Sequence, residues 1–443
     1  MNWKYILIVV ILAAVTASLT LWLRKIPEIP VVTNLEITKT EKTEPEPEKE
    51  VIFNSDGMVR TLDKELILEK IEQGKDFLFQ MADEKEKGFH KYYYAEIDEF
   101  EDRLHTVYSA SIIYTFLYVN DLEEDEEILE NLEDWGDFLL SMQNQDKESE
   151  KYGAFHYSYY LSTKEKEERF VVGTAALSIF TLLRLYDLTG DSRYLASARL
   201  AGDWLITMQK ENGSVKSYVR NDNGNWFYGT KESILYNGQT LSAFSKLYQT
   251  TKEKKYYDSA ERIAQYFAQK YEQTQGFIAG EYREENPISN SWVIMSLVDF
   301  YRINPDDYYK EIIFSLAEKV VEKQKNDPSD LSCYGSWWRV YSTSGVGWIS
   351  EVMTETYRFC QEQGRENCQN YKDSALKAMR LLIQNTFSEE NSSGLKNSAR
   401  AIGGVFWNAE NKYVRTDSVC HALNGYLRIM DYLEEGPLIS IPE

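Results

Sequence analysis

The sequence lacks any surplus of positive charge. Its 49 Lys and Arg residues stand against 71 Asp and Glu residues, which gives a net charge of −22. A surface of that sign repels a phosphate backbone, so DNA and RNA are excluded as partners. Apolar residues are abundant: 43% of the 443 residues are hydrophobic and 14% are aromatic. This composition excludes disorder for most of the chain and predicts one or two globular domains.

Charge is absent from residues 5–23, a run bounded on both sides by basic residues. A bilayer core needs about 20 apolar residues, so this run can span a membrane. A cleaved signal peptide is the alternative, with small residues at Ala17 and Ser18, but the apolar run continues to Leu23. We predict a retained membrane anchor over residues 1–25. A short N-terminal anchor usually leaves the remainder of the chain extracytoplasmic, and we expect that location here.

Large apolar residues are scarce in residues 26–58, which are rich in Glu, Lys, Thr and Pro. Such a segment cannot bury enough surface to offset its chain entropy. We predict that it is a disordered linker between the anchor and a folded domain over residues 59–436.

A pattern of strands is absent from most of this domain, and helical repeats take its place. The segments 74–78, 136–140 and 202–206 read GKDFL, GDFLL and GDWLI, and three later segments continue the pattern more loosely. Each belongs to an amphipathic helix and is followed by a loop and by a second helix that is apolar nearly all round. The second helices are expected near residues 109–119, 171–185, 238–248, 291–301, 346–357 and 418–433.

A helix that is apolar on all sides is buried, whereas an amphipathic helix lies outside. Six outer–inner pairs in succession predict an all-α fold, an (α/α)6 toroid of six helical hairpins. In such a ring, the loops from outer to inner helices share one face with the N-termini of the inner helices.

These loops are unusually aromatic, although exposed loops normally avoid large rings. Either the rings fill the centre of the toroid, or they meet a ligand with flat apolar faces, such as a sugar. The loop residues that we select as candidates for substrate binding are Tyr157, Trp226, Tyr228, Arg283, Trp337, Trp338, Arg339, Trp407 and Arg415.

Acid–base candidates are concentrated near the last inner helix, in a chain with only four histidines. Asp417 is expected at the N-cap of that helix, and His421 lies one turn further on the same face. A carboxylate that orients an imidazole forms an acid or base, although a cap and a core histidine would explain the same residues. Glu281 and Tyr282, in the fourth loop, are the other catalytic candidates.

Cysteine is scarce, with four residues in the chain. Cys360 and Cys368 flank an expected turn at a spacing that permits a disulfide, and two free thiols are the alternative. The segments Cys333-Tyr334-Gly335 and Cys420-His421 resemble zinc-binding pieces of lanthionine-synthetase-like cyclases and of protein prenyltransferase β subunits. This resemblance implies Cys333, Cys420 and His421 as zinc ligands. Since Ala422 stands where a glycine is expected, we predict no metal and no cofactor, with zinc as the alternative.

The six-hairpin repeat, the aromatic loops and segments such as 142–146 (MQNQD) and 208–214 (MQKENGS) resemble the superfamily of (α/α)6 carbohydrate-active enzymes. It includes unsaturated glucuronyl hydrolases, alginate-type lyases, N-acylglucosamine 2-epimerases and the C-terminal part of D-glucuronyl C5-epimerases. The resemblance is one of architecture, and no complete catalytic motif of one member is matched. It implies a hydrolase, lyase or epimerase that acts on an oligo- or polysaccharide, whose carboxylates the loop arginines would hold if the substrate is anionic. A non-catalytic glycan-binding or cell-envelope scaffold is the alternative.

Overall fold

A computed structural model describes residues 57–279 and 286–442. The predicted membrane anchor, the linker up to residue 56, and the candidates Glu281, Tyr282 and Arg283 lie outside the described residues. Within the described ranges, no helix is long and apolar enough to cross a membrane.

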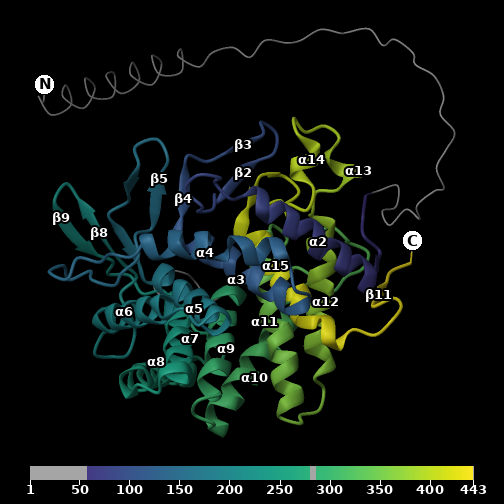
Figure 1. Cartoon of the computed structure of the whole chain (residues 1–443). Coiled ribbons are helices and arrows are strands. Elements are labelled where there is room, and N and C mark those ends of the chain that lie inside the picture. The colour runs from purple at the N-terminus through teal and green to yellow at the C-terminus, as the bar shows by residue number, and fades with distance from the viewer. Residues whose placement is uncertain (1–56, 280–285, 443) are drawn as a thin grey trace, which may run out of the picture. The chain divides into compact units, whose positions relative to one another are not determined.

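In the described ranges, twelve long helices alternate between an outer and an inner ring, as the repeat predicts. Figure 1 shows the arrangement of these helices. The outer helices are α2 (Lys64–Gln80), α4 (Glu126–Ser141), α6 (Ser192–Met208), α8 (Lys254–Thr274), α10 (Asp307–Glu322) and α12 (Gln369–Gln384). The inner helices are α3 (Thr106–Leu122), α5 (Val172–Thr189), α7 (Ile234–Thr251), α9 (Pro287–Tyr301), α11 (Thr343–Glu362) and α15 (Thr416–Ile429). Each inner helix packs against the next, and α15 packs against α3, so the inner ring is closed. The predicted (α/α)6 toroid is confirmed.

Composition decides which helix lies inside. Helix α9 buries every residue from Ser289 to Phe300, because it is surrounded by neighbours on all sides. Helix α8 instead buries one stripe that includes Tyr256, Ala260, Ile263 and Phe267, spaced three or four residues apart, and exposes its Lys and Glu residues. The inner helices also approach closely: a Cβ atom on Gly238 of α7 would lie 2.8 Å from the Trp292 carbonyl oxygen of α9.

Short strands line the face at which the inner helices begin, which the sequence pattern did not predict. They form three antiparallel sheets with the orders β10-β2-β3, β4-β5-β6 and β7-β8-β9. Their bounds are β10 (Val414–Arg415), β2 (Tyr92–Tyr94), β3 (Glu99–Phe100), β4 (Arg103–His105), β5 (Ser158–Tyr160), β6 (Glu165–Lys166), β7 (Arg169–Val171), β8 (Tyr218–Asp222) and β9 (Asn225–Tyr228). Strands β10, β4 and β7 lead directly into the inner helices α15, α3 and α5, and each pairs with a hairpin of the next loop. Figure 1 shows these hairpins standing off the helices at one side of the ring.

Smaller elements complete the domain. The last long loop holds α13 (Glu389–Ser392) and α14 (Ser398–Ala401), and a 3-10 turn, η1 (Met430–Tyr432), follows α15. Strand β1 (Thr61–Leu62) pairs antiparallel with β11 (Ile439–Ser440), so residues that precede the first hairpin are bonded to residues that follow the last one.

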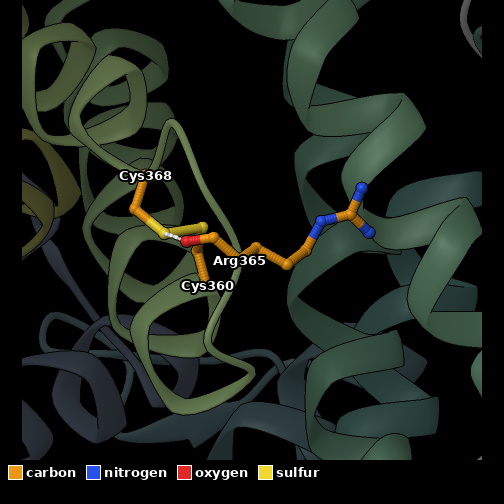
Figure 2. The surroundings of a disulfide bond; sticks show 3 residues. All are labelled: Cys360, Arg365 and Cys368. Atoms are coloured by element: carbon orange, nitrogen blue, oxygen red, sulfur yellow. Dashed lines mark hydrogen bonds between the residues drawn. A yellow bond between two sulfur atoms is a disulfide. The ribbon is translucent and has the colours of Figure 1, made fainter.

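A disulfide joins the last turn of α11 to the residue before α12. The sulfur atoms of Cys360 and Cys368 are 1.97 Å apart (Figure 2). The Cys368 sulfur also lies 3.2 Å from the carbonyl oxygen of Arg365, in the turn that the bond closes. Of the two alternatives for these cysteines, the structure has the bonded one.

Candidate active site

A cavity of about 470 Å³ opens at the N-terminal ends of the inner helices, and we call it the cup. All six inner helices contribute to its wall, together with the loop residues Tyr157 and Trp407. Two of the predicted substrate-binding aromatics are therefore in the cup. Its aromatic and polar lining includes Tyr108, Gln239, Trp292, Trp348, Asp417 and His421.

His421 lies in the floor of the cup and is held by a buried carboxylate. Its Nδ1 atom is 3.1 Å from Oε2 of Glu351 on α11, whose side chain is only 4% exposed. The ring packs against Trp348 with the centroids 5.2 Å apart. With the Nδ1 proton donated to Glu351, Nε2 is the basic nitrogen, and it makes no hydrogen bond to any described residue. Nε2 is therefore free for a ligand.

Beneath His421, a second cavity of about 150 Å³ continues along the axis of the ring. It shares His421, Trp292 and Trp348 with the cup. Arg428 lies in its wall, with Nη2 3.3 Å from Oε1 of Glu351. Both oxygens of Glu351 therefore face a cationic or hydrogen-donating partner, which keeps the carboxylate in a fixed position behind His421.

The same arginine joins Glu351 to a deeper carboxylate. Arg428 donates from Nη1 to Glu355 across 3.0 Å, and Glu355 also pairs with Arg302 and Arg358. Burial opposes ionisation of Glu355, but the three guanidinium groups prevail and lower its pKa to about 2. This cluster therefore stays ionised at neutral pH. Its ion pairs fix the position of Arg428, which in turn holds Glu351.

Asp417 has a partner other than His421. Arg415 donates from Nε and Nη2 to the two oxygens of Asp417, each across 2.6 Å, and its guanidinium lies 4.3 Å from the centre of the Trp407 ring. The predicted N-cap role of Asp417 is wrong: the cap residue is Arg415, and Asp417 lies in the first turn of α15. The physical reason is that a bidentate guanidinium partner competes successfully for both carboxylate oxygens.

Tyr108 contributes a phenol to the cup. Burial raises the pKa of the Tyr108 phenol well above its ordinary value, and the nearby Asp417 carboxylate adds to this effect. The group therefore remains protonated at neutral pH and can donate a proton or a hydrogen bond. The pKa of Arg415 is also raised, because the pull of Asp417 outweighs the desolvation of the guanidinium.

Several predicted substrate-binding residues lie away from the cup. Trp337 is 4% exposed and donates from Nε1 to the Val320 carbonyl oxygen across 2.8 Å, so it belongs to the core beside α10. Trp338 packs partly against the core, and Arg339 is exposed, without lining the cup. The assignment of Trp337 is corrected, because its ring gains more by burial in the core than it would at an exposed site. Trp338 and Arg339 lie outside the cup, and their substrate-binding role stays a prediction.

Trp226 and Tyr228 also lie outside the cup, on strand β9. They are 37% and 39% exposed. Lys151 lies 4.1 Å from the centre of the Trp226 ring, and Lys216 lies 4.4 Å from that of Tyr228. Trp226 and Tyr228 therefore belong to the β8–β9 hairpin and not to the wall of the cup.

The zinc alternative fails on geometry. In the two described ranges, no group of three or more His, Cys, Asp or Glu side chains is placed to hold a metal ion. Cys333 contacts Asp330 in the loop before α11, with Sγ 3.3 Å from Oδ2. Cys420 instead lines the axial cavity on α15, and burial raises the pKa of its thiol. Cys333, Cys420 and His421 therefore do not form a site.

Glu351, Tyr108 and the stacked pair Trp292 and Trp348 were not selected from the sequence. The ring centroids of the two tryptophans are 3.7 Å apart. A signal for Glu351 does exist, because Glu351 and Glu355 are the two acids, one turn apart, in residues 346–357, the segment in which a buried inner helix is expected. Buried carboxylates are rare unless they are paired, so they mark an interior site.

Comparisons with known proteins identify the fold. A family model described as the Ulvan lyase N-terminal domain matches residues 132–231, which run from α4 to the loop after β9. A search of curated proteins finds no match.

Among solved structures, cellobiose 2-epimerase from Bacillus thermoamylovorans B4167 has 12% identity and a TM-score of 0.67, covering 84% of this chain and 99% of that one. Unsaturated glucuronyl hydrolase from Streptococcus agalactiae has 14% identity and a TM-score of 0.60, with coverages of 89% and 100%. An α-1,6-mannanase of Salegentibacter sp. HEL1_6 has 12% identity and a TM-score of 0.58, with coverages of 82% and 99%. At such identities the likeness shows the six-hairpin fold, which agrees with the architecture that the sequence resembles.

Proposed function

We propose that this protein is a saccharide-processing enzyme in which His421 transfers the proton. One observation carries the proposal: His421 faces the cup with Nδ1 on the buried Glu351 and with Nε2 left for a ligand. The lining of Trp and Tyr residues supplies flat surfaces for the apolar faces of sugar rings, and the polar groups between them suit hydroxyl groups.

Elimination or epimerisation fits this site better than hydrolysis. Glycoside hydrolysis commonly uses two carboxyl groups, one of them protonated. The described carboxylates near His421 are both held by cations, since Asp417 in the cup is bound by Arg415 and Glu351 behind the imidazole by Arg428. His421 Nε2 instead takes a proton from a carbon next to a carboxyl or carbonyl group. In elimination the glycosidic C–O bond then breaks as the double bond forms, and Tyr108 gives its proton to the departing oxygen; in epimerisation Tyr108 gives its proton to the opposite face of the same carbon. Glu281 and Tyr282 remain proposed acid–base groups, and Arg283 a proposed substrate contact.

The names of similar proteins support the substrate class. An epimerase that acts on cellobiose, a glucuronyl hydrolase and a mannanase share the fold, and the matching family model describes a lyase domain. The reactions that we propose, elimination and epimerisation, are both represented among these names.

A panel of acidic and neutral oligo- and polysaccharides tests the proposal with the purified full-length chain in detergent. Elimination creates a conjugated double bond that absorbs in the ultraviolet, and epimerisation in D2O brings deuterium to the carbon that lost its proton. Hydrolysis gives new reducing ends with neither signal. We expect one of the first two signals with the wild type and a loss of about 10²- to 10⁴-fold in the His421→Ala variant.

His156→Ala is the matched control, because His156 bonds the Glu167 carbonyl oxygen outside the cup. An equally active His421→Ala variant would remove His421 from the chemistry. Binding without turnover of any saccharide would favour the non-catalytic scaffold.

We further propose that residues 1–25 anchor the protein in a membrane, with the folded domain extracytoplasmic. The uncharged run of residues 5–23 supports the anchor. The disulfide between Cys360 and Cys368 supports the location, because disulfides persist mainly in oxidising compartments. Deletion of residues 1–25 should move the protein from the membrane to the soluble fraction, and protease added to intact cells should reach the domain. Protection from that protease would contradict the proposed orientation.

A further inference from the structure

We propose that one face of the β7–β8–β9 sheet is a subsite for an acidic saccharide, with Arg169 and Arg220 as the groups that bind its anions. The inference rests on the proposed function, because it names the substrate class of the same site and a second place where the substrate is held.

The strand register places both arginines on the same face. Arg169 on β7 is opposite Arg220 on β8, and Arg220 is opposite Phe227 on β9. Val171 is opposite Tyr218 in the same sheet. Because residues alternate between faces along a strand, these five side chains share one face, which we call the arginine face.

The two arginines lack the carboxylate partners that such a pair usually has. Like charges directly opposite each other on neighbouring strands are destabilising. Neither arginine forms a salt bridge with a described residue, and the Nε atom of Arg169 is buried without a hydrogen-bond partner. The nearby acids have other partners: Glu167 and Asp222, each two residues from an arginine, accept hydrogen bonds from Ser158 and Asn223. Glu168, next to Arg169, accepts one from Asn221.

In the neighbouring β4–β5–β6 sheet, the arginine that corresponds to Arg169 has a carboxylate partner. Arg103 on β4 occupies the place of Arg169, three residues before an inner helix, and is opposite Tyr160. There, a carboxylate of Glu101 lies 3.6 Å from the guanidinium. The chain carries 71 acidic residues, so a missing carboxylate beside Arg169 and Arg220 indicates that a ligand supplies the negative charge.

The arginine face continues from the cup. Val171 and Tyr157 both line the cup, and the Arg169 guanidinium lies 4.8 Å from the centre of the Tyr157 ring and 5.6 Å from that of Tyr218. Further out, Phe227 is 50% exposed. A saccharide that leaves the cup over Tyr157 therefore meets two guanidinium groups between aromatic rings.

This arrangement suits an acidic sugar chain. A guanidinium group binds a carboxylate or a sulfate through two parallel N–H donors, and the flanking rings accept the apolar face of a sugar. A carboxylate and a sulfate both offer two oxygens to a guanidinium group, so the geometry does not distinguish them. Polymers that carry only one of these two anions do.

Binding of polymers to the full-length His421→Ala chain in detergent tests the proposal without consuming the ligand. The probes are polygalacturonate for carboxylates, dextran sulfate for sulfates, and neutral dextran. We expect an acidic polymer to bind more tightly than dextran, and the Arg169→Gln/Arg220→Gln double variant to raise its Kd about tenfold or more. Arg193→Gln/Arg199→Gln is the matched control, because it removes the same two charges from exposed arginines on the outer helix α6.

Stability and turnover separate the outcomes. We expect the double variant to melt no lower than its parent, because it loses a repulsion and no internal salt bridge. An unchanged Kd for both acidic polymers in the folded double variant overturns the inference, and so does equal affinity for dextran. Turnover of neutral saccharides alone overturns it while the proposed enzyme stands. Arginine-dependent binding of an acidic polymer that is never turned over supports the subsite and overturns the proposed enzyme.

Discussion

At the scale of single residues, Glu351 and Glu355 differ in what they hold, although they lie one turn apart on α11. Glu351 orients His421 and is itself held by Arg428. Glu355 is surrounded by Arg302, Arg358 and Arg428. The first carboxylate serves the proposed chemistry directly, and the second compensates the positive charges that surround it.

Glu351→Gln tests the orienting role. The amide keeps the size of the side chain but no longer stabilises a charged imidazole and permits the other ring tautomer. We expect turnover of a substrate found in the panel to fall by about a hundredfold or more, with KM changed less than kcat. The Glu351→Asp variant keeps the charge and should recover part of the loss. An amide variant with the activity of the wild type would contradict the orienting role.

Glu355 should make the free energy of unfolding depend on pH in the acid range. Its folded pKa of about 2 lies below the ordinary value of 4.5, so its stabilising effect is complete above about pH 5 and is lost as the pH falls toward 2. Glu355→Gln should therefore cost about 3 kcal/mol at pH 7, and the difference from the wild type should shrink through that acid window. Denaturant unfolding of both proteins at a series of pH values measures this difference. A gap that is constant with pH would contradict the low pKa.

At the scale of elements, the hairpin of α11 and α12 combines a functional helix with a covalent link. Helix α11 carries Glu351 and Glu355 inside the ring, and the disulfide fixes its C-terminal end to the start of α12. The joint lies at the opposite end of α11 from the cup, so it can stabilise the helix pair without touching a ligand.

The Cys360→Ser/Cys368→Ser variant tests this element. The bond closes a loop with a sequence separation of 8, and the chain-entropy model gives about 2.5 kcal/mol for such a short loop. We expect the variant to lose about that free energy of unfolding and to keep its turnover. A reducing agent should lower the stability of the wild type to the level of the variant and leave the variant unchanged. Insensitivity of the wild type to reduction would contradict the bond.

At the scale of the whole folded domain, closure of the ring brings residues from its two ends together. Strand β1 pairs with β11, and Arg380 on α12 donates to the carbonyl oxygens of Val59 and Leu331. The first and last hairpins also pack, because α15 contacts α2 and α3. The cup requires this closure, since α3 and α15 form adjacent parts of its wall.

Removal of residues 437–443 tests the contribution of the β1–β11 pairing. The deletion removes the hydrogen bonds from Leu438 to Leu62 and from Ile441 to Arg60. We expect a lower midpoint of thermal unfolding, still in a single transition, with unchanged turnover at low temperature because no deleted residue lines the cup. Two separate unfolding transitions in the deleted protein would instead show that the ring is held together chiefly by this pairing.

The sequence alone determined the six hairpins. A helix that is buried on one side carries an apolar stripe, and a helix that is buried on all sides is apolar all round, so each type can be recognised from its own residues. It also indicated the face on which the aromatic loops gather, and it selected Tyr157, Trp407, Arg415, Asp417 and His421, all of which line the cup. Tertiary structure alone decided the partners. His421 is held by Glu351, which is 70 residues away, and Arg169 is placed against Arg220 by a register that no local pattern contains. Those distances follow from how the ring closes and how its rim strands pair, and both are set by the packing of the whole domain.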